Sequence, residues 1–263
     1  MKKKPEMQIT EAELTSLTHD LNDMHRDTLP RMQEAVAELR GERGTSRRGF
    51  LFGAAGITAG ALIVAACGSD KKNTTASSGS AGSTAAPSGT SGEKLTGDFA
   101  IAALAASLEN LAVQTYQAGL DAATAGKLGS VPPAVATFAT TVQMQHKDHA
   151  AAWNSILTGA GKSAVTGVDK TVQDAVVTPG FANVHNVVDL AKFALSLEDV
   201  AAATYLNGIQ NAIQDAGAIK VAGSIQPIEM QHSAILLLLL GDYPIPDTFA
   251  KTTGARGPDD VIG

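Results

Sequence analysis

The chain has 263 residues, of which 44% are hydrophobic and 17% charged, so composition predicts neither a disordered chain nor an integral membrane protein. Nine basic and nine acidic residues precede Phe50, while 11 basic and 17 acidic residues follow Cys67, giving a net charge of -6 and no basic surface for nucleic acid. Few aromatics and abundant alanine favour helices over sheets, and the single cysteine excludes an internal disulfide or an iron–sulfur cluster.

Residues 1–45 form an N-terminal extension whose apolar residues follow a helical spacing. The pattern is interrupted near Pro30, so it predicts one amphipathic helix or a pair of helices in the cytoplasm. Two explanations remain open: an upstream start codon, with Met32 as an alternative start, or a cytoplasmic interaction role. The apolar positions are Leu14, Leu17, Leu21, Met24, Leu29, Met32, Val36 and Leu39.

Residues 46–66 have the features of an export signal. Arg47 and Arg48 lie in a Ser-Arg-Arg-Gly-Phe-Leu segment that resembles the twin-arginine signal, and a Gly-rich apolar run too short to span a membrane follows. The run ends in Val-Ala-Ala-Cys67, which resembles the cleavage and lipidation site of bacterial lipoproteins. We expect export by the twin-arginine machinery and a lipid on Cys67 that anchors the protein to the outer face of the cytoplasmic membrane. The alternative is a buried cysteine on an apolar helix.

The segment 67–95 carries Cys67 and a linker rich in Ser, Gly, Thr and Ala. Such a sequence cannot bury enough apolar surface to offset its ordering entropy, so it predicts a flexible tether. A folded domain at 96–242 and a tail at 243–263 complete the predicted organisation.

Two similar units occur within residues 96–242. Each has a Glu seven residues before a Tyr, followed later by a Met-Gln-His sequence. The first unit supplies Glu109, Tyr116, Gln143 and His146, and the second supplies Glu198, Tyr205, Glu229 and His232.

Apolar spacing in this region predicts four helices, at about 97–125, 132–158, 184–213 and 217–240. Pro132 and Pro133 are placed to begin the second helix, and Pro227 lies inside the fourth, where it should disturb the backbone. The two halves are joined by some 25 residues. We therefore expect an all-α fold, a four-helix bundle with one long crossover between helices two and three, which is the connectivity of ferritin-like bundles.

The glutamates of the two units fall on otherwise apolar helix faces. After Thr96 the chain has only three, Glu109, Glu198 and Glu229, whereas scattered surface charge would not select these positions. Carboxylates that converge in a dry interior repel one another and lose hydration, which a pair of divalent cations would offset. Oxygen and imidazole ligands suit iron, manganese or zinc.

These motifs resemble the ferritin-like superfamily, in particular bacterial ferritin-like proteins of the rubrerythrin and desiccation-related type, over about the last 165 residues. The resemblance implies two metal ions, iron or else manganese, and no nucleotide. It implies Tyr116 and Tyr205 as hydrogen-bond partners of ligand carboxylates. The implied ligands are Glu109, His146, Glu198, Glu229 and His232.

The sequence departs from the family pattern at Gln143, where a Glu is expected. An amide is a weaker ligand, so either the second metal ion binds loosely or His149, one turn past His146, completes the site. His149 has the alternative of an ordinary core or surface histidine, and we expect His185 to face solvent.

The leading functional hypothesis is a two-metal redox protein that oxidises Fe(II) or consumes O2 or peroxide. The alternative is a non-catalytic surface or stress-protective bundle with a structural or degenerate metal site. Residues 235–240 are apolar on all sides, so we expect a homodimer or the C-terminal tail to cover them.

Overall fold

The computed structural model describes residues 9–53 and 95–257. The chain divides into two units, one of residues 1–44 with 95–263 and one of residues 45–94. Of the second unit, the structure describes only residues 45–53. These residues are the C-terminal end of helix α1 (Glu11–Gly53) and include Arg47 and Arg48. Cys67 and nearly all of the predicted linker lie outside the described residues, so export, lipidation and tethering stay predictions.

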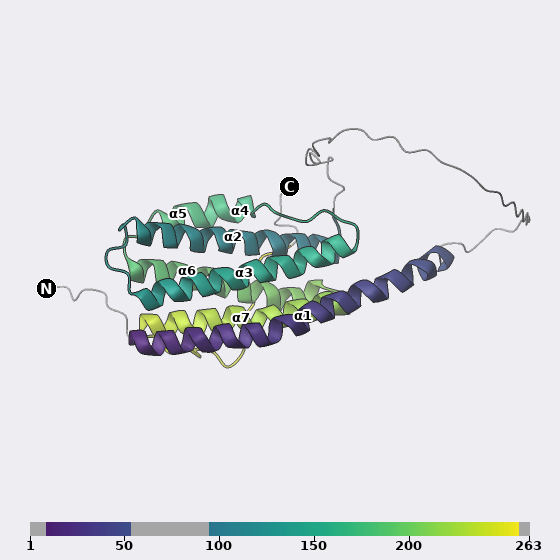
Figure 1. The fold of residues 1–263 in the computed structure, drawn as a ribbon. Helices are drawn as coiled ribbons and strands as arrows, with labels where there is room; N and C mark the ends of the chain where they lie inside the picture. Colours follow the sequence, from purple (N-terminus) through teal and green to yellow (C-terminus); the bar gives the residue numbers. More distant parts are fainter. Residues whose placement is uncertain (1–8, 54–94, 258–263) are drawn as a thin grey trace, which may run out of the picture. The chain divides into compact units, whose positions relative to one another are not determined.

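Four long helices build the first unit: α2 (Asp98–Thr124), α3 (Pro133–Gly159), α6 (Val187–Asn207) and α7 (Ala216–Leu240) (Figure 1). Helix α2 packs along α3 and α6 along α7, which gives two hairpins. The described residues contain no strand. The predicted all-α, ferritin-like bundle is confirmed. The last turns of the predicted third helix form a separate π-helical segment, η2 (Gly208–Ala212).

Local sequence signals explain where these helices begin and end. Helix α3 starts at the proline pair, where a missing N–H costs no helical hydrogen bond. The Asn186 side chain caps α6 and the Asp215 side chain caps α7. Helix α7 runs through Pro227 and ends at Gly241, whose φ of 83° lies in the left-handed region that glycine adopts without strain.

The crossover between α3 and α6 contains the short helical segments α4 (Lys170–Val172), η1 (Gln173–Val177) and α5 (Thr178–Phe181). Two asparagines of the bundle fix its first part. Asn154 donates to the carbonyl oxygen of Val165 at 2.9 Å and accepts from the same residue's N–H at 2.7 Å. Asn110 donates to the carbonyl oxygens of Val165 and Gly167. The crossover is therefore held to both helices of the first hairpin.

Helix α1 is one continuous helix through Pro30, and its first half packs on the bundle. It begins with a capping box, in which Thr10 and Glu13 bond reciprocally. Leu14 and Leu21 are buried in a cluster with apolar side chains of α3 and α7, including those of Ile235, Leu236 and Leu239. The apolar end of α7 is thus covered in part by α1, a partner that the sequence did not lead us to expect.

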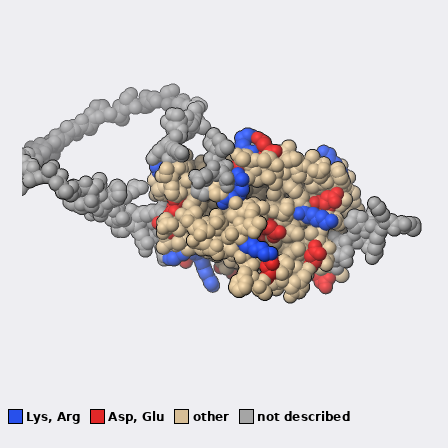
Figure 2. Space-filling view, turned by 180° about the vertical axis from the view of Figure 1, so that it is seen from behind, with Lys and Arg blue, Asp and Glu red and all other residues tan. Residues whose placement is uncertain are grey.

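Figure 2 shows one face of the molecule, on which lysine and arginine side chains alternate with aspartate and glutamate. On that face neither sign gathers into a large patch. Among the described helices, none is both long and apolar enough to cross a membrane.

Candidate metal centre

Six buried side chains from all four long helices converge in the middle of the bundle. Each is exposed by 4% or less. Their potential ligand atoms form two overlapping groups, and within each group these atoms lie within 4.8 Å of one another. The first group is Glu109, His146, His149 and Glu229, and the second is His146, Glu198, Glu229 and His232.

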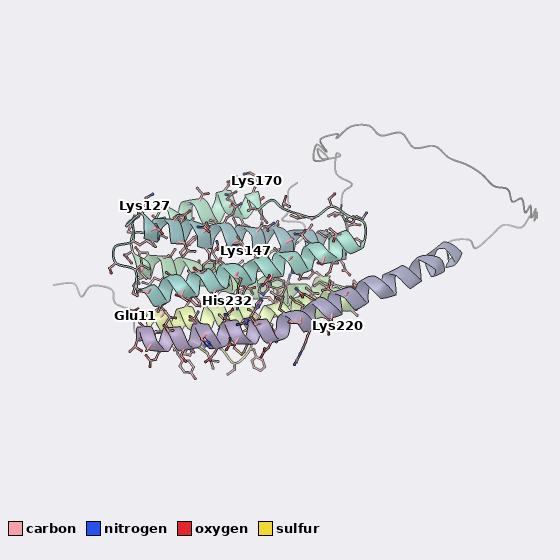
Figure 3. All side chains as sticks on the ribbon, in the orientation of Figure 1. Glu11, Lys127, Lys147, Lys170, Lys220 and His232 are labelled. Carbon is pink, nitrogen blue, oxygen red and sulfur yellow. The ribbon has the colours of Figure 1, made fainter. Side chains whose placement is uncertain are left out.

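His146 and Glu229 belong to both groups. The Nδ1 atom of His146 lies 2.7 Å from Oε2 of Glu109, and its Nε2 atom lies 3.3 Å from Oε1 of Glu198. The Glu229 carboxylate has Oε1 at 2.9 Å from Nδ1 of His149 and Oε2 at 3.5 Å from Nδ1 of His232. His232, labelled in Figure 3, lies among the helices and is fully buried.

The two tyrosines of the repeats hold carboxylates across the bundle. Tyr116 of the first unit donates to Oε1 of Glu198 in the second unit at 2.5 Å, and Tyr205 of the second unit donates to Glu109 of the first. Trp153 stacks on the Tyr205 ring and donates to its hydroxyl oxygen at 2.9 Å. Each tyrosine therefore fixes one carboxylate oxygen of the opposite hairpin.

Comparison with known proteins agrees with this geometry. The model of the ferritin-like domain family matches residues 97–242, which is more than half of the chain. The chain belongs to the ferritin-like domain family. No curated protein and no solved structure matches the sequence. The family match covers both hairpins and the crossover, so it includes all six residues of the ferritin-like centre.

The sequence left the roles of Gln143 and His149 open, and the structure separates them. The Gln143 side chain is engaged elsewhere: its amide nitrogen donates to the carbonyl oxygen of Val113 and to Gln117, and its Oε1 atom accepts from Lys147 at 3.2 Å. His149 belongs to the first group and is exposed by only 1%. His149 therefore lies among the candidate ligands, at a distance from which it could complete the site. His185 is exposed, as expected.

Buried histidines and carboxylates shift one another's pKa strongly. Burial alone would raise the pKa of Glu109, but the charge of His149 and hydrogen bonds from His146 and His149 outweigh it, and the pKa falls to about 2. Burial alone would lower the pKa of His149, yet Glu109 and Glu229 raise it to about 9. The pKa of Glu198 is likewise lowered, and those of His146 and His232 are raised. Without metal, these shifts favour protonated histidines beside ionised Glu109 and Glu198.

This network predicts how the stability of the metal-free protein depends on pH. The raised pKa of His149 stabilises the fold below about pH 6.5, and this contribution is lost as pH rises through about 9. The lowered pKa of Glu109 stabilises the fold above about pH 4.5, and this contribution is lost as pH falls through about 2. We expect the melting temperature of the chelator-treated protein to be highest between about pH 4.5 and 6.5. A melting temperature that rises from pH 7 to 9.5 would contradict this assignment.

The donor set fits a pair of divalent cations. Glu229 is fully buried, yet neither of its carboxylate oxygens accepts a well-directed hydrogen bond, although His149 is only 2.9 Å away. A buried anion without directed donors is costly, and a metal ion is the usual remedy. Three carboxylates and three imidazoles are also ligands that iron and manganese accept. The buried cluster of this ferritin-like chain is compatible with a metal site.

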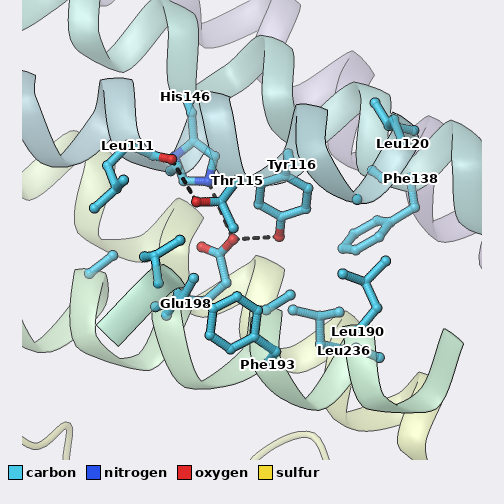
Figure 4. A pocket seen from close by; sticks show the side chains of 18 of the residues that line it. Leu111, Thr115, Tyr116, Leu120, Phe138, His146, Leu190, Phe193, Glu198 and Leu236 are labelled. Carbon is cyan, nitrogen blue, oxygen red and sulfur yellow. Dashed lines mark hydrogen bonds and ion pairs between the residues drawn. The ribbon is translucent and has the colours of Figure 1, made fainter. Parts of the chain in front are cut away.

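An apolar cavity of about 110 Å³ extends from this centre between α2 and α6 (Figure 4). Tyr116 and Glu198 form its polar end, and His146 also borders it. Small residues on both helices, among them Gly119 and Ala194, leave the space unfilled. The centre thus borders an apolar cavity.

Proposed function

We propose that this chain is an extracytoplasmic, membrane-tethered ferritin-like protein that binds two iron or manganese ions and oxidises Fe(II), or consumes O2 or peroxide. The observation that carries the proposal is the pair of overlapping ligand groups sharing His146 and Glu229. The Glu229 carboxylate, with two oxygens, could serve both cations and keep them close enough to act together, while His146 would bind one of them. Of the ferritin-like proteins, we favour the rubrerythrin and desiccation-related type because of the repeated Glu, Tyr and Met-Gln-His positions.

The bound ions would supply the one-electron redox steps that amino-acid side chains cannot. The protein would supply the rest. Tyr116 orients the carboxylate of Glu198, and Tyr205 orients that of Glu109. These hydrogen bonds fix the positions of candidate ligand oxygens. In the intact chain, burial of the centre excludes bulk water, and the cavity that Tyr116 borders would offer space for a small apolar oxidant such as O2.

The export part of the proposal depends on the order of sequence signals. Arg47 and Arg48 precede an apolar run, and the only cysteine, Cys67, closes it. Cleavage before Cys67 and lipidation would leave the bundle tethered by the segment up to residue 95. Peptide mass spectrometry of the membrane fraction tests this directly: it should detect a lipid-modified Cys67 as the mature N-terminus, and residues 1–66 still attached would contradict export.

Oxygen uptake tests the redox part. In the Fe(II)-oxidising reaction iron is the substrate: two Fe(II) lose one electron each, and one O2 takes up both electrons and two protons to become H2O2. We expect the full chain, loaded with two Fe(II) without oxygen, to consume O2 at least about 100-fold faster than free Fe(II) under the same conditions. Glu198→Gln should abolish this gain, whereas Asp199→Asn, at the neighbouring exposed acid, should keep it. Uptake no faster than that of free Fe(II) would contradict the proposal.

A second candidate function is a non-catalytic, stress-protective bundle. It is favoured by the charge balance of the centre, in which three imidazolium ions can neutralise three carboxylates without metal. Under this alternative, the chain purified without added metal would contain none, and chelation would leave its melting temperature unchanged.

A further inference from the structure

The N-terminal helix α1 is an extra helix that the proposed chemistry does not use. A single stripe of its surface is buried, with Leu14 exposed by 0%, Thr18 by 3%, Leu21 by 2% and His25 by 5%. These residues follow one another at intervals of four, three and four, so they lie on one face of the helix. Met24, on another face, is exposed by 47%. The helix therefore docks through one face, as a partner of the bundle.

The docked face covers the side of the bundle formed by α3 and α7. Leu14 and Leu21 join the apolar cluster of Phe138, Val142 and Leu236. Further along α1, Val36 is buried in the second large cluster, which contains Trp153 and Ile225. Helix α1, which runs alongside α7 in Figure 1, thus contributes residues to both clusters.

Two polar contacts connect α1 to the candidate metal centre. Gln145 donates from Nε2 to the Leu21 carbonyl oxygen at 3.3 Å, while its Oε1 atom lies 2.7 Å from Nε2 of His232. The ring of His25 lies 6.1 Å from that of His149, and its Nε2 atom is 2.9 Å from Oδ2 of Asp148. Gln145 therefore links α1 to His232 through two hydrogen bonds, and His25 of α1 packs beside His149.

The position of α1 in the chain shows when its contacts with the bundle would be lost. It precedes Cys67, so cleavage before that residue would release every contact just described. No other described segment lies between α1 and the α3/α7 face at Gln145, because Gln145 bonds α1 directly. Release of α1 would thus uncover the side of the bundle next to His149 and His232. The four long helices would stay connected in one chain.

We propose that α1 is a removable cover: it closes the α3/α7 side of the metal centre in the intact chain and opens that side when the chain is cut before Cys67. The proposal rests on the proposed function only for the timing of the cut. In the precursor the centre is closed on this side, which slows metal exchange and access of water-soluble reagents. In the mature protein the same side is available to them.

Cutting the folded full chain tests the cover. A site for a specific protease is inserted within residues 70–90, the purified metal-free protein is cut, and the N-terminal fragment is removed by dilution and gel filtration. Hydrogen exchange is then followed by mass spectrometry. We expect exchange to rise at least tenfold in α3 around residues 142–150 and in α7 around residues 229–239, while α2 and α6 stay protected.

Two variants of the intact chain provide the matched comparison. Leu14→Asp with Leu21→Asp places charges on the docked face and should reproduce the increase without any cut. Met24→Asp places the same charge on the exposed face of the same helix and should behave as wild type. These exchange measurements need no metal, so they decide the proposal even if the chain binds none.

Two results would overturn the cover. If exchange in α3 and α7 is the same before and after removal of the fragment, α1 does not protect that side. If all four long helices lose protection together, α1 is a permanent part of the fold and is not removable. A mature protein found with residues 1–66 attached would refute export alone.

Discussion

Replacing Glu229 by glutamine should abolish tight binding of both metal ions. Glu229 belongs to both ligand groups and is fully buried, so the change removes a shared carboxylate that no other side chain can replace. Loss of a hydrogen-bond partner around a metal typically weakens binding about 10- to 100-fold, so loss of a shared ligand should weaken it by at least about 100-fold. Equilibrium titration with Mn(II) or Co(II) measures the effect.

The repeat supplies a matched control for this substitution. Gln143 occupies the position of the first unit that corresponds to Glu229 in the second, but its amide is bonded to Val113, Gln117 and Lys147. Gln143→Ala should therefore retain two bound ions per chain with affinities within a few fold of wild type. If Gln143→Ala instead weakens binding as much as Glu229→Gln, the position of Gln143 in the structure is not the one that the metal-bound protein adopts.

Metal affinity should rise steeply with pH between 6 and 8. In the metal-free centre, Glu109 and Glu229 raise the pKa of His149 to about 9, and neighbouring carboxylates also raise those of His146 and His232. A cation binds the neutral imidazole, so it must displace a proton from each histidine that it recruits. Each proton released makes the affinity rise about tenfold per pH unit. Calorimetry in buffers of different ionisation enthalpy counts these protons.

Single histidine substitutions separate this effect from general pH effects on the protein. His149→Gln should lower the number of released protons by one, because the His149 proton is then missing. His185→Gln removes an exposed histidine and should leave the number unchanged. An affinity that is constant from pH 6 to 8 would mean that the histidines of the centre are neutral before metal binds.

The four-helix fold and most of the centre were predictable from sequence because they depend on local periodicity. Apolar residues at helical spacing located α2, α3, α6 and α7, and the proline pair marked the start of α3. The carboxylates were visible for the same reason: Glu109, Glu198 and Glu229 interrupt apolar faces that must point inward. The structure brings all three together.

The choice between Gln143 and His149 could not be made from sequence. Both lie three residues from His146 on α3, so both share part of its face. Which of them points at the centre depends on the rotation of α3 against its neighbours, and that rotation is set by tertiary packing. The hydrogen bonds of Tyr116 to Glu198 and of Tyr205 to Glu109 could not be assigned from sequence for a similar reason, because they depend on how the two hairpins pack together.

The docking of α1 on the bundle could not be predicted from the sequence either. Its apolar stripe predicted a partner surface, but a stripe does not identify the surface that covers it. The apolar end of α7 suggested a second copy or the C-terminal tail. The described residues place Leu14 and Leu21 in one cluster with that end, and a second copy stays a prediction. Two unexplained patterns far apart in the sequence were thus the two sides of one interface.

The central claim is that six buried side chains hold two divalent cations, and anomalous X-ray scattering from crystals grown with Mn(II) tests it most directly. We predict two anomalous peaks about 3.5 to 4 Å apart, both in contact with Glu229 and only one of them in contact with His146. One peak should also contact Glu109 and His149, and the other Glu198 and His232. Crystals at full Mn(II) saturation with no peak among these residues, or with imidazole–carboxylate contacts unchanged and peaks only at the surface, would contradict it.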